Sequence, residues 1–148
     1  MTFIEEKNDL FNYEGEAWLA HCISADFGMG KGIVVKFNER YDLKNYMIKN
    51  HVRNNWSGRG YCIPVSEYKV FNLVTKDKYY KKPTYGTVKQ ALIDMRNYAL
   101  AKDINKIAMP TIAAGLDFLT WSKVREIIQN VFNNTDIEII VCRYKGEE

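Results

Sequence analysis

The sequence is poor in cysteine and proline and has no long apolar run. Its three cysteines, Cys22, Cys62 and Cys142, lie in separate apolar stretches and form no CxxC pair. This spacing argues against a zinc site or a redox pair and favours small core residues in a reducing compartment. No apolar run of about 18 residues is present, and the first residues lack the apolar segment of a secretory signal. We therefore expect a cytoplasmic protein with no membrane span, no metal and no other cofactor.

A large excess of charge of one sign is also missing. The 21 lysines and arginines against 18 aspartates and glutamates leave a formal net charge of +3. This charge is too small to indicate a nucleic-acid-binding protein by itself, but it suits an anionic small molecule. The basic run at residues 76–82 is typical of a solvated loop. No linker or repeat divides the 148 residues, of which 47% are hydrophobic, so we expect a single domain over residues 1–148.

Short apolar runs alternate with stretches of helical periodicity. Helices are expected at residues 33–41, from the N-cap candidate Thr84 to Ala99, and at 121–132 after Thr120. Strands are expected at residues 18–24, 61–65, 68–74, 106–109 and 137–142, the second and third as a hairpin joined by Ser66 and Glu67. This order predicts an α/β fold, a three-layer α/β/α sandwich with a mixed, mainly parallel sheet.

The first of two unusual loops runs from Ser24 to Ile33, between a predicted strand and a predicted helix. Gly28, Gly30 and Gly32 alternate in it. Without side chains at these positions, backbone amides can approach an anion, and the helix N-terminus adds a favourable dipole. The spacing matches neither the dinucleotide-binding GxGxxG pattern nor a Walker A motif. A flexible turn explains the glycines equally well.

The second loop, Met109–Asp117, also follows a predicted strand and precedes a predicted helix. Its small residues Ala113, Ala114 and Gly115 would again allow close backbone approach, and Asp117 follows at the lip. A lone aspartate here is more often a local turn cap. Ligands of open α/β sheets bind at the carboxyl ends of the strands, so the two loops together predict a clamp for a diphosphate.

The ordered set of motifs resembles the macrodomain family, within it the branch of terminal ADP-ribose protein glycohydrolases and the small stand-alone ADP-ribose-1″-phosphate phosphatases. The resemblance runs from about Asn8 to Cys142. The blocks that carry it are Ala20–Ser24, Met29–Ile33, Val74–Lys76, Lys82–Tyr85, Met109–Pro110, Gly115–Asp117 and Trp121.

The resemblance implies an ADP-ribose site. Asp9 matches the aspartate that accepts a hydrogen bond from the adenine amine, with Leu10 beside the purine. The two loops would hold the diphosphate and the distal ribose by backbone dipoles, without a strongly basic composition. The ligand-binding residues implied are Asp9, Leu10, Ser24, Met29, Gly30, Lys31, Gly32, Ile33, Thr75, Ile112, Ala113, Ala114, Gly115 and Leu116.

The resemblance further implies that Lys76 and Asp117 are catalytic. A neutral lysine amine, favoured by partial burial, could attack the anomeric carbon of the distal ribose, and a carboxylate could act as base or resolve the adduct. Read without the resemblance, Lys76 is a solvated lysine at a strand end. Relatives often carry two glycines where this chain has Ala113-Ala114-Gly115, whose methyls would narrow the ribose pocket.

Several functions stay open at this stage. The preferred one is hydrolysis at the distal ribose, removing ADP-ribose from acidic side chains, as on an ADP-ribosylated protein, or from O-acetyl-ADP-ribose. A phosphatase for ADP-ribose-1″-phosphate would give weight to His21, which otherwise reads as a packed core residue with a satisfied imidazole. A non-catalytic reader of ADP-ribose is a third possibility. Action on ADP-ribosylated nucleic acid through Tyr79 and Tyr80 is not favoured, because no base-reading element is visible.

Overall fold

The computed structural model describes residues 1–143. Its elements are β1 (Thr2–Lys7), the 3-10 helix η1 (Leu10–Tyr13), β2 (Trp18–Ser24), α1 (Val34–Tyr41), α2 (Leu43–Asn50), β3 (Tyr61–Val65), β4 (Val70–Lys76), α3 (Tyr85–Ala101), β5 (Lys106–Met109), α4 (Trp121–Phe132) and β6 (Glu138–Arg143).

Six strands form one sheet in the order β1-β6-β5-β2-β4-β3. The neighbours β1 and β6, β6 and β5, β5 and β2, and β2 and β4 all pair in parallel, whereas β3 pairs antiparallel with β4 at the edge. The expected mixed, mainly parallel sheet is therefore confirmed. The parallel strands end at one edge of the sheet, and the loops that follow them gather there.

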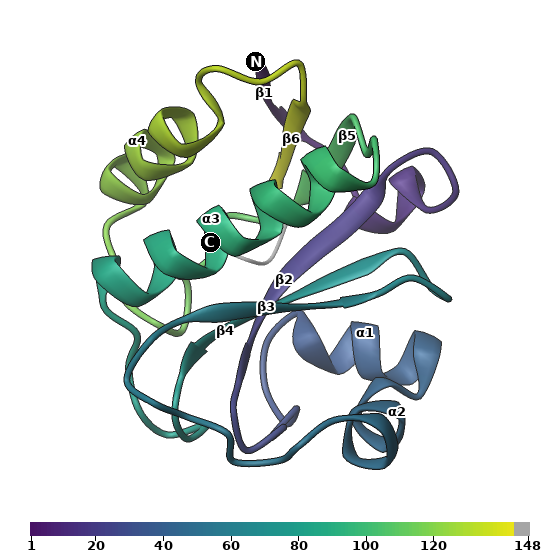
Figure 1. Ribbon diagram of the computed structural model, residues 1–148, viewed down its shortest axis with the longest axis vertical. Helices are drawn as coiled ribbons and strands as arrows, with labels where there is room; N and C mark the ends of the chain where they lie inside the picture. The colour runs from purple at the N-terminus through teal and green to yellow at the C-terminus, as the bar shows by residue number, and fades with distance from the viewer. Residues whose placement is uncertain (144–148) are drawn as a thin grey trace.

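The helices lie on both faces of the sheet (Figure 1). One core cluster contains Val88 of α3 and Val124 of α4, and the other contains Phe37 of α1 and Met47 of α2. The expected three-layer sandwich is thus confirmed.

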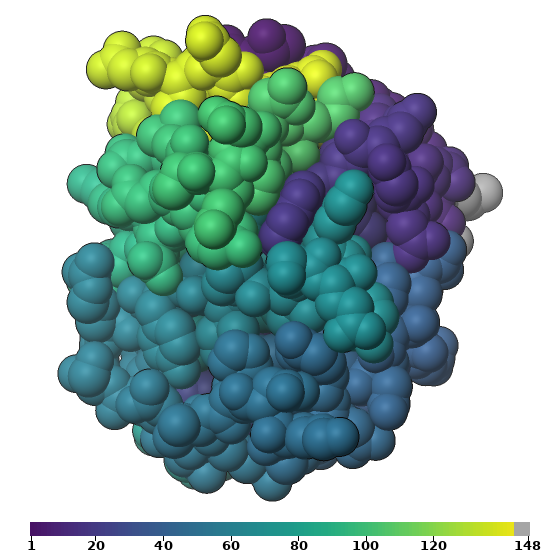
Figure 2. Space-filling view, turned by 45° about the vertical axis from the view of Figure 1, so that its right-hand side comes forward, coloured from purple at the N-terminus to yellow at the C-terminus, as the bar shows by residue number. Residues whose placement is uncertain are grey.

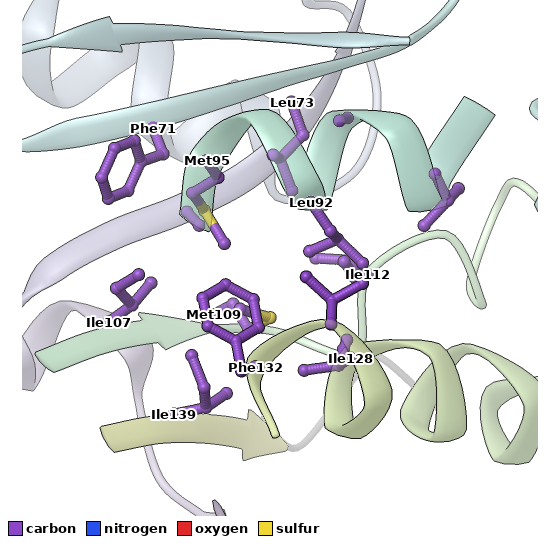
Figure 3. Packing of buried hydrophobic residues seen from close by; sticks show 14 of the residues in the cluster. Phe71, Leu73, Leu92, Met95, Ile107, Met109, Ile112, Ile128, Phe132 and Ile139 are labelled. Carbon is purple, nitrogen blue, oxygen red and sulfur yellow. The ribbon is translucent and has the colours of Figure 1, made fainter. Parts of the chain in front are cut away.

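The side chains of β4 show how one strand serves two cores. Phe71 and Leu73 belong to the cluster under α3 and α4 (Figure 3), and Val70 and Val74 belong to the cluster under α1 and α2. Successive residues of a strand point to opposite faces, so a strand covered on both sides must be apolar at nearly every position. The exceptions are Asn72, whose side chain is buried and hydrogen-bonded, and Thr75 and Lys76 at the carboxyl end of the strand.

The structure corrects several boundaries. The β3–β4 connection is a four-residue turn, Ser66–Lys69, because Lys69 takes a positive φ of 56° that a strand does not tolerate. The last strand is Glu138–Arg143, one residue later than expected. Thr84 caps α3 as predicted, in a reciprocal capping box with Thr87. Thr120 occupies the N-cap of α4, but its side chain makes no capping hydrogen bond.

Three elements were not predicted: β1, the 3-10 helix η1 and α2. Cys62 and Cys142 are buried as expected, and Cys22 is partly buried and packs against the core cluster under α3 and α4. None of the helices among the described residues has the length and apolar character of a bilayer-spanning segment.

Figure 2 shows the side of the molecule where β2 and β5 begin. The segment before β2, the β3–β4 turn and the chain after α3 line a shallow hollow there, formed by residues 16–18, Lys69 and 102–106. This hollow lies at the amino ends of the strands, away from the two glycine-rich and alanine-rich loops.

Candidate active site

Three neighbouring strands bring the predicted site together. In the sheet β2 lies between β5 and β4, and these strands end at Ser24, Met109 and Lys76. The first loop (residues 24–33) follows β2, and the second loop (residues 109–117) follows β5. Lys76 is the last residue of β4, the neighbour of β2 on its other side. The three predicted features therefore share one edge of the sheet.

Lys76 and Asp117 form an ion pair. The Nζ of Lys76 donates to Oδ1 of Asp117 at 2.7 Å, and the two side chains are only 15% and 14% exposed. The expectation that Lys76 belongs to a solvated loop is wrong for this residue, although residues 79–82 of the same run are exposed. At this separation a proton can pass between the amine and the carboxylate, which is the geometry required of an acid–base partner.

Cys22 lies next to this ion pair. Burial, together with the nearby carboxylate of Asp117, raises the pKa of its thiol to about 12, although Lys76, the hydroxyl of Thr75 and the backbone of Ala113 act in the opposite direction. A thiol with this pKa stays protonated at neutral pH, so Cys22 is poorly suited to be a nucleophile.

The first loop presents unpaired backbone amides. Among the described residues, no group accepts a hydrogen bond from the amides of residues 29–33, which lead directly into the N-terminus of α1. Gly32 has a φ of +77°, a conformation that residues with side chains rarely adopt. Such a run of free donors at a helix N-terminus is suited to an anion.

The second loop faces the first. A Cβ built on Gly32 would lie 3.3 Å from Cδ1 of Leu116, so the two loops approach within van der Waals reach. Ala113 and Phe118 both have positive φ, and Leu119 N donates to Ala113 O, which closes the loop on itself. The amides of residues 114–117 are not used by any described residue.

Lys82 holds the second loop from outside. Its Nζ donates to the carbonyl of Leu116 at 2.7 Å and lies 4.4 Å from the centre of the Phe118 ring. Leu116 and Phe118 are themselves 55% and 77% exposed. The sequence reasoning missed this contact, because the basic run gave no indication of which lysine reaches the second loop.

The remaining predicted ligand residues lie on or beneath the same edge. Asp9 accepts a hydrogen bond from Phe11 N through Oδ1 and is partly exposed, whereas Leu10 is 2% exposed and belongs to the core under α1. Ser24, Met29, Thr75, Ile112 and Ala113 are also buried, and Gly30, Lys31, Gly32, Gly115 and Leu116 are exposed, with Ile33 and Ala114 intermediate. Direct contact of each with a ligand stays a prediction.

His21 is part of the core rather than of the site. Its ring stacks on Phe37 with centroids 3.8 Å apart, it is fully buried, and Nε2 lies 2.6 Å from Oδ1 of Asn72. The expected core placement is confirmed, but the imidazole is only half satisfied, because Nδ1 has no partner among the described residues. A fully buried ring cannot touch a ligand, so His21 is not placed to act on a substrate as the phosphatase hypothesis would require.

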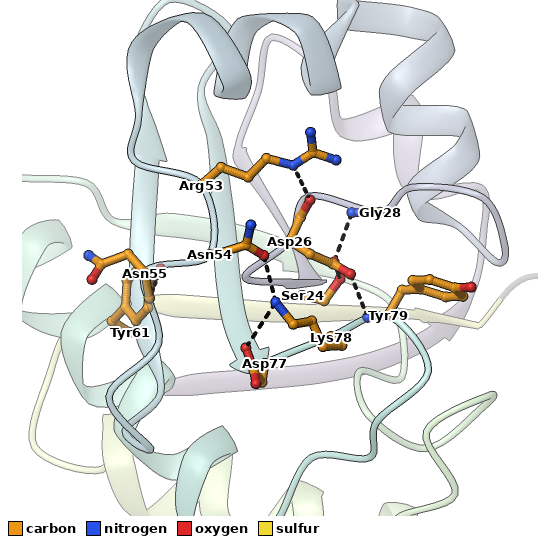
Figure 4. A network of polar contacts seen from close by, with 10 residues as sticks. All are labelled: Ser24, Asp26, Gly28, Arg53, Asn54, Asn55, Tyr61, Asp77, Lys78 and Tyr79. Carbon is orange, nitrogen blue, oxygen red and sulfur yellow. Dashed lines mark hydrogen bonds and ion pairs between the residues drawn. The ribbon is translucent and has the colours of Figure 1, made fainter.

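Asp26 is the other residue of the edge that the sequence reasoning missed. Its carboxylate accepts hydrogen bonds from Ser24, Gly28 and Tyr79 (Figure 4). Across residues 1–143, no three or more histidine, cysteine, aspartate or glutamate side chains are grouped in a way that could hold a metal ion.

No protein-family model matches the chain. It is, however, 34% identical over 135 residues to the ADP-ribose glycohydrolase OARD1 of Homo sapiens, a match that covers 91% of this chain and 87% of the relative. The Bos taurus ADP-ribose glycohydrolase OARD1 matches with the same identity and coverage.

Solved structures share the fold. The macrodomain of Thermus aquaticus DarG superposes with a TM-score of 0.78 at 22% identity, covering 95% of this chain and 97% of that one. The macrodomain of Mycobacterium tuberculosis DarG gives 0.77 at 20% identity, with 97% of both chains covered. Thermosipho africanus DarTG in complex with ADP-ribose gives 0.74 at 16% identity, covering all of this chain and 43% of that one.

Proposed function

The chain belongs to the macrodomain family, among the relatives of ADP-ribose glycohydrolase OARD1, and we propose that it is a hydrolase that binds ADP-ribosyl derivatives and cleaves a bond at the distal ribose. The observation that carries this proposal is the ion pair of Lys76 and Asp117, which joins the end of β4 to the second loop, beside the unpaired amides of the first loop. A diphosphate on those amides would bring the distal ribose toward the ion pair.

The diphosphate has a suitable environment on the first loop. Its two negative charges would meet the amides of residues 29–33 and the positive end of the α1 dipole, and Lys31 adds an exposed ammonium group. The amides of residues 114–117 would close from the other side. Asp9 would accept a hydrogen bond from the adenine amine at the other end of the ligand, with Leu10 below it.

The proposed reaction begins with a proton transfer from Nζ of Lys76 to Asp117, for which the 2.7 Å contact is suited. The neutral amine then attacks the anomeric carbon of the distal ribose. The new C–N bond forms as the C–O bond to the leaving group breaks, and an acyl group departs as a carboxylate without needing a proton. This first half leaves ADP-ribose covalently joined to Lys76.

Water completes the cycle. Asp117, after it has lost its proton to solvent, takes a proton from the attacking water as a new C–O bond forms at the anomeric carbon. The C–N bond breaks, and the released amine takes the proton that Asp117 received from the water, which restores both the Lys76 ammonium group and the Asp117 carboxylate. The net reaction consumes one water and releases ADP-ribose and a carboxylic acid, so the substrates proposed are ADP-ribose on an acidic side chain, as on an ADP-ribosylated protein, and O-acetyl-ADP-ribose.

The test is turnover of glutamate-linked ADP-ribose and of O-acetyl-ADP-ribose by Lys76→Ala and Asp117→Ala. We expect each variant to lower kcat by about a hundredfold or more, because each removes a group that takes part in bond making. Binding of ADP-ribose, measured by calorimetry, should persist in both. Turnover by both variants at the wild-type rate would refute the mechanism.

Lys106→Ala is the matched control. Lys106 is also a partly exposed lysine in an ion pair, with Glu138 at 3.7 Å, but it lies at the start of β5. Its removal should leave kcat unchanged. In the same assay, ADP-ribose-1″-phosphate and ADP-ribosylated DNA would show whether the leaving group can be a phosphate or a base, and binding without turnover on every substrate would indicate a reader.

A further inference from the structure

Asp26 joins the first loop to the chain segment that follows Lys76. Its Oδ1 accepts hydrogen bonds from Ser24 Oγ at 2.5 Å and from Gly28 N at 3.0 Å, both within the first loop. Its Oδ2 accepts from Tyr79 N at 3.1 Å, three residues beyond Lys76. Figure 4 shows the carboxylate between these donors. One side chain therefore holds two segments that are 53 residues apart in the sequence.

The two segments are in close contact at this point. A Cβ built on Gly28 would lie 2.9 Å from Cβ of Tyr79, closer than real Cβ atoms approach one another. At the main-chain level, Ala25 N donates to Lys76 O at 2.9 Å. The path of the first loop is thus set by the segment that carries Lys76, and the Asp26 carboxylate adds the contacts beyond the end of the strand.

A third segment supports the back of Asp26. Arg53 Nε donates to the main-chain carbonyl of Asp26 at 2.8 Å, and Asn54 N donates to the carbonyl of Ala25 at 2.8 Å. Lys78 in turn donates to Oδ1 of Asn54 at 2.8 Å. The chain between α2 and β3 therefore holds both the first loop and the Lys76 segment from outside.

We propose that Asp26 is a positioning residue, which fixes the amides of the first loop relative to Lys76 so that a bound diphosphate places the distal ribose at the amine. The inference rests on the proposed function. Asp26 itself would not touch the substrate, because the donors of Ser24, Gly28 and Tyr79 already occupy both of its oxygens.

The charge state of Asp26 is consistent with this role. Partial burial raises the pKa of its carboxyl, but the hydrogen bonds from Ser24, Gly28 and Tyr79 outweigh it and leave the pKa below its usual value. The group is therefore an ionised acceptor at neutral pH. Asparagine has the same size but replaces one acceptor oxygen by an amide donor, which must face either Tyr79 N or the Ser24 and Gly28 donors.

Calorimetric titration of wild type and Asp26→Asn with ADP-ribose tests the assignment. We expect the variant to bind with full stoichiometry but about tenfold more weakly, as the loss of hydrogen bonds to a charged group implies. A merely structural role would lower the stoichiometry, because part of the protein would be unfolded, and would leave Kd unchanged. That result, or a Kd within about twofold of wild type at full stoichiometry, would overturn the assignment.

Asp94→Asn is the matched control. The Asp94 carboxylate also accepts from a backbone amide, Cys62 N at 2.8 Å, but at the contact of α3 with β3. Its replacement should lower the thermal midpoint without changing Kd. An equal rise in Kd in both variants would overturn the inference, whereas a wild-type protein that does not bind ADP-ribose would overturn the proposed function first.

A second pair of variants applies if Asp26→Asn does not fold. Tyr79→Ala keeps the amide that donates to Asp26 and removes the ring, whereas Tyr79→Pro removes the amide. We expect Tyr79→Ala to bind within about twofold of wild type and Tyr79→Pro about fivefold more weakly, since only the latter loses a hydrogen bond to the carboxylate. Equal affinities in the two variants would contradict the role of Asp26.

Discussion

At the scale of single residues, His21 is a buried base, and among the described residues only one of its two ring nitrogens has a hydrogen-bond partner. Asn72 Nδ2 donates to Ile63 O, so its Oδ1 is the acceptor, and the proton of the neutral imidazole must lie on Nε2. Nδ1 is left as an unpartnered acceptor in an apolar layer. Burial lowers the pKa of His21 from 6.5 to about 4, because desolvation of the charged ring outweighs the hydrogen bond to Asn72, which acts in the opposite direction.

This pKa predicts a loss of stability in mild acid. Between pH 6.5 and about pH 4 the unfolded chain binds a proton at His21 that the folded chain refuses. As the pH is lowered across this window, the free energy of unfolding should therefore fall by about 3 kcal/mol. Below about pH 4, His21 should cause no further loss. Urea unfolding at a series of pH values measures the effect.

His21→Gln isolates the contribution of the imidazole, because glutamine does not titrate. Carboxyl groups with lowered pKa, such as Glu5, Glu14 and Asp26, lose their contribution in acid in both proteins and cancel in the comparison. The difference between wild type and variant should thus depend on pH only through His21. A difference that is constant from pH 7 to pH 4 would show that the imidazole takes up its proton in the folded state.

Cys22 gives a second test at this scale. It lies beside Lys76 and Asp117, yet its thiol pKa of about 12 leaves almost no thiolate at neutral pH. We expect Cys22→Ala to keep kcat within about threefold of wild type, in contrast to Lys76→Ala. The hydrolase assay described above measures this. A loss of turnover in Cys22→Ala as large as that in Lys76→Ala would contradict the assignment of Lys76 as the nucleophile.

How much of the site the sequence predicts depends on the kind of contact. The family motifs single out Lys76 and Asp117, and the predicted parallel sheet brings the loops that follow its strands to one edge, but their ion pair is seen only in the structure. Asp26 carries no such signal, since its importance comes from amides of residues that are distant in the sequence.

At the scale of the elements, the start of β3 is pressed against α3. A Cβ on Gly60 would lie 2.0 Å from the carbonyl oxygen of Thr87, and Gly60 N donates to Gln90 Oε1 at 2.8 Å. Gly60→Ala should therefore destabilise the fold by about 3 kcal/mol, as overpacking against a rigid backbone does. Chemical denaturation measures the loss.

Gly86→Ala is the opposite case on the same helix. A Cβ there would meet only Thr84 Oγ1 at 3.6 Å, an ordinary contact, and alanine has the higher helix propensity. This variant should be more stable than wild type by about 0.5 kcal/mol. If Gly60→Ala were as stable as Gly86→Ala, the close approach of β3 to α3 would be wrong.

The elements that the sequence predicts are those with strong apolar periodicity. The missed elements lack it: β1 has no fully buried residue and carries Glu5, which pairs with Arg125 of α4, and α2 buries only Leu43 and Met47. The break before α2 falls at Asp42, which adopts a positive φ of 50° without a glycine to announce it. Local pattern fails where the packing comes from distant contacts.

At the scale of the whole molecule, the two loops are held at one edge of a sheet that is covered by helices on both faces. A ligand that joins these loops should bind the folded state alone and stabilise it. At a concentration of ADP-ribose a hundred times Kd, the gain is about 2.7 kcal/mol, which corresponds to a rise of roughly 5 to 10 °C in Tm for a chain of this size. Scanning calorimetry with and without ligand measures it.

Lys76→Ala supplies the control for this shift. Its catalytic amine is gone, but the amides of the two loops are intact, so ADP-ribose should raise its Tm about as much as that of wild type. Adenosine, which has no diphosphate, should raise neither by more than about 1 °C at the same concentration. Equal shifts with adenosine and ADP-ribose would mean that the loops do not hold the diphosphate.

The most direct measurement is a crystal structure of the Lys76→Ala protein with ADP-ribose. The account predicts a diphosphate within hydrogen-bonding distance of the amides of residues 29–33 and 114–117, with the anomeric carbon of the distal ribose facing position 76 and Asp117. Crystals grown with saturating ADP-ribose in which these amides hold no diphosphate, or in which the distal ribose points away from position 76, would contradict it.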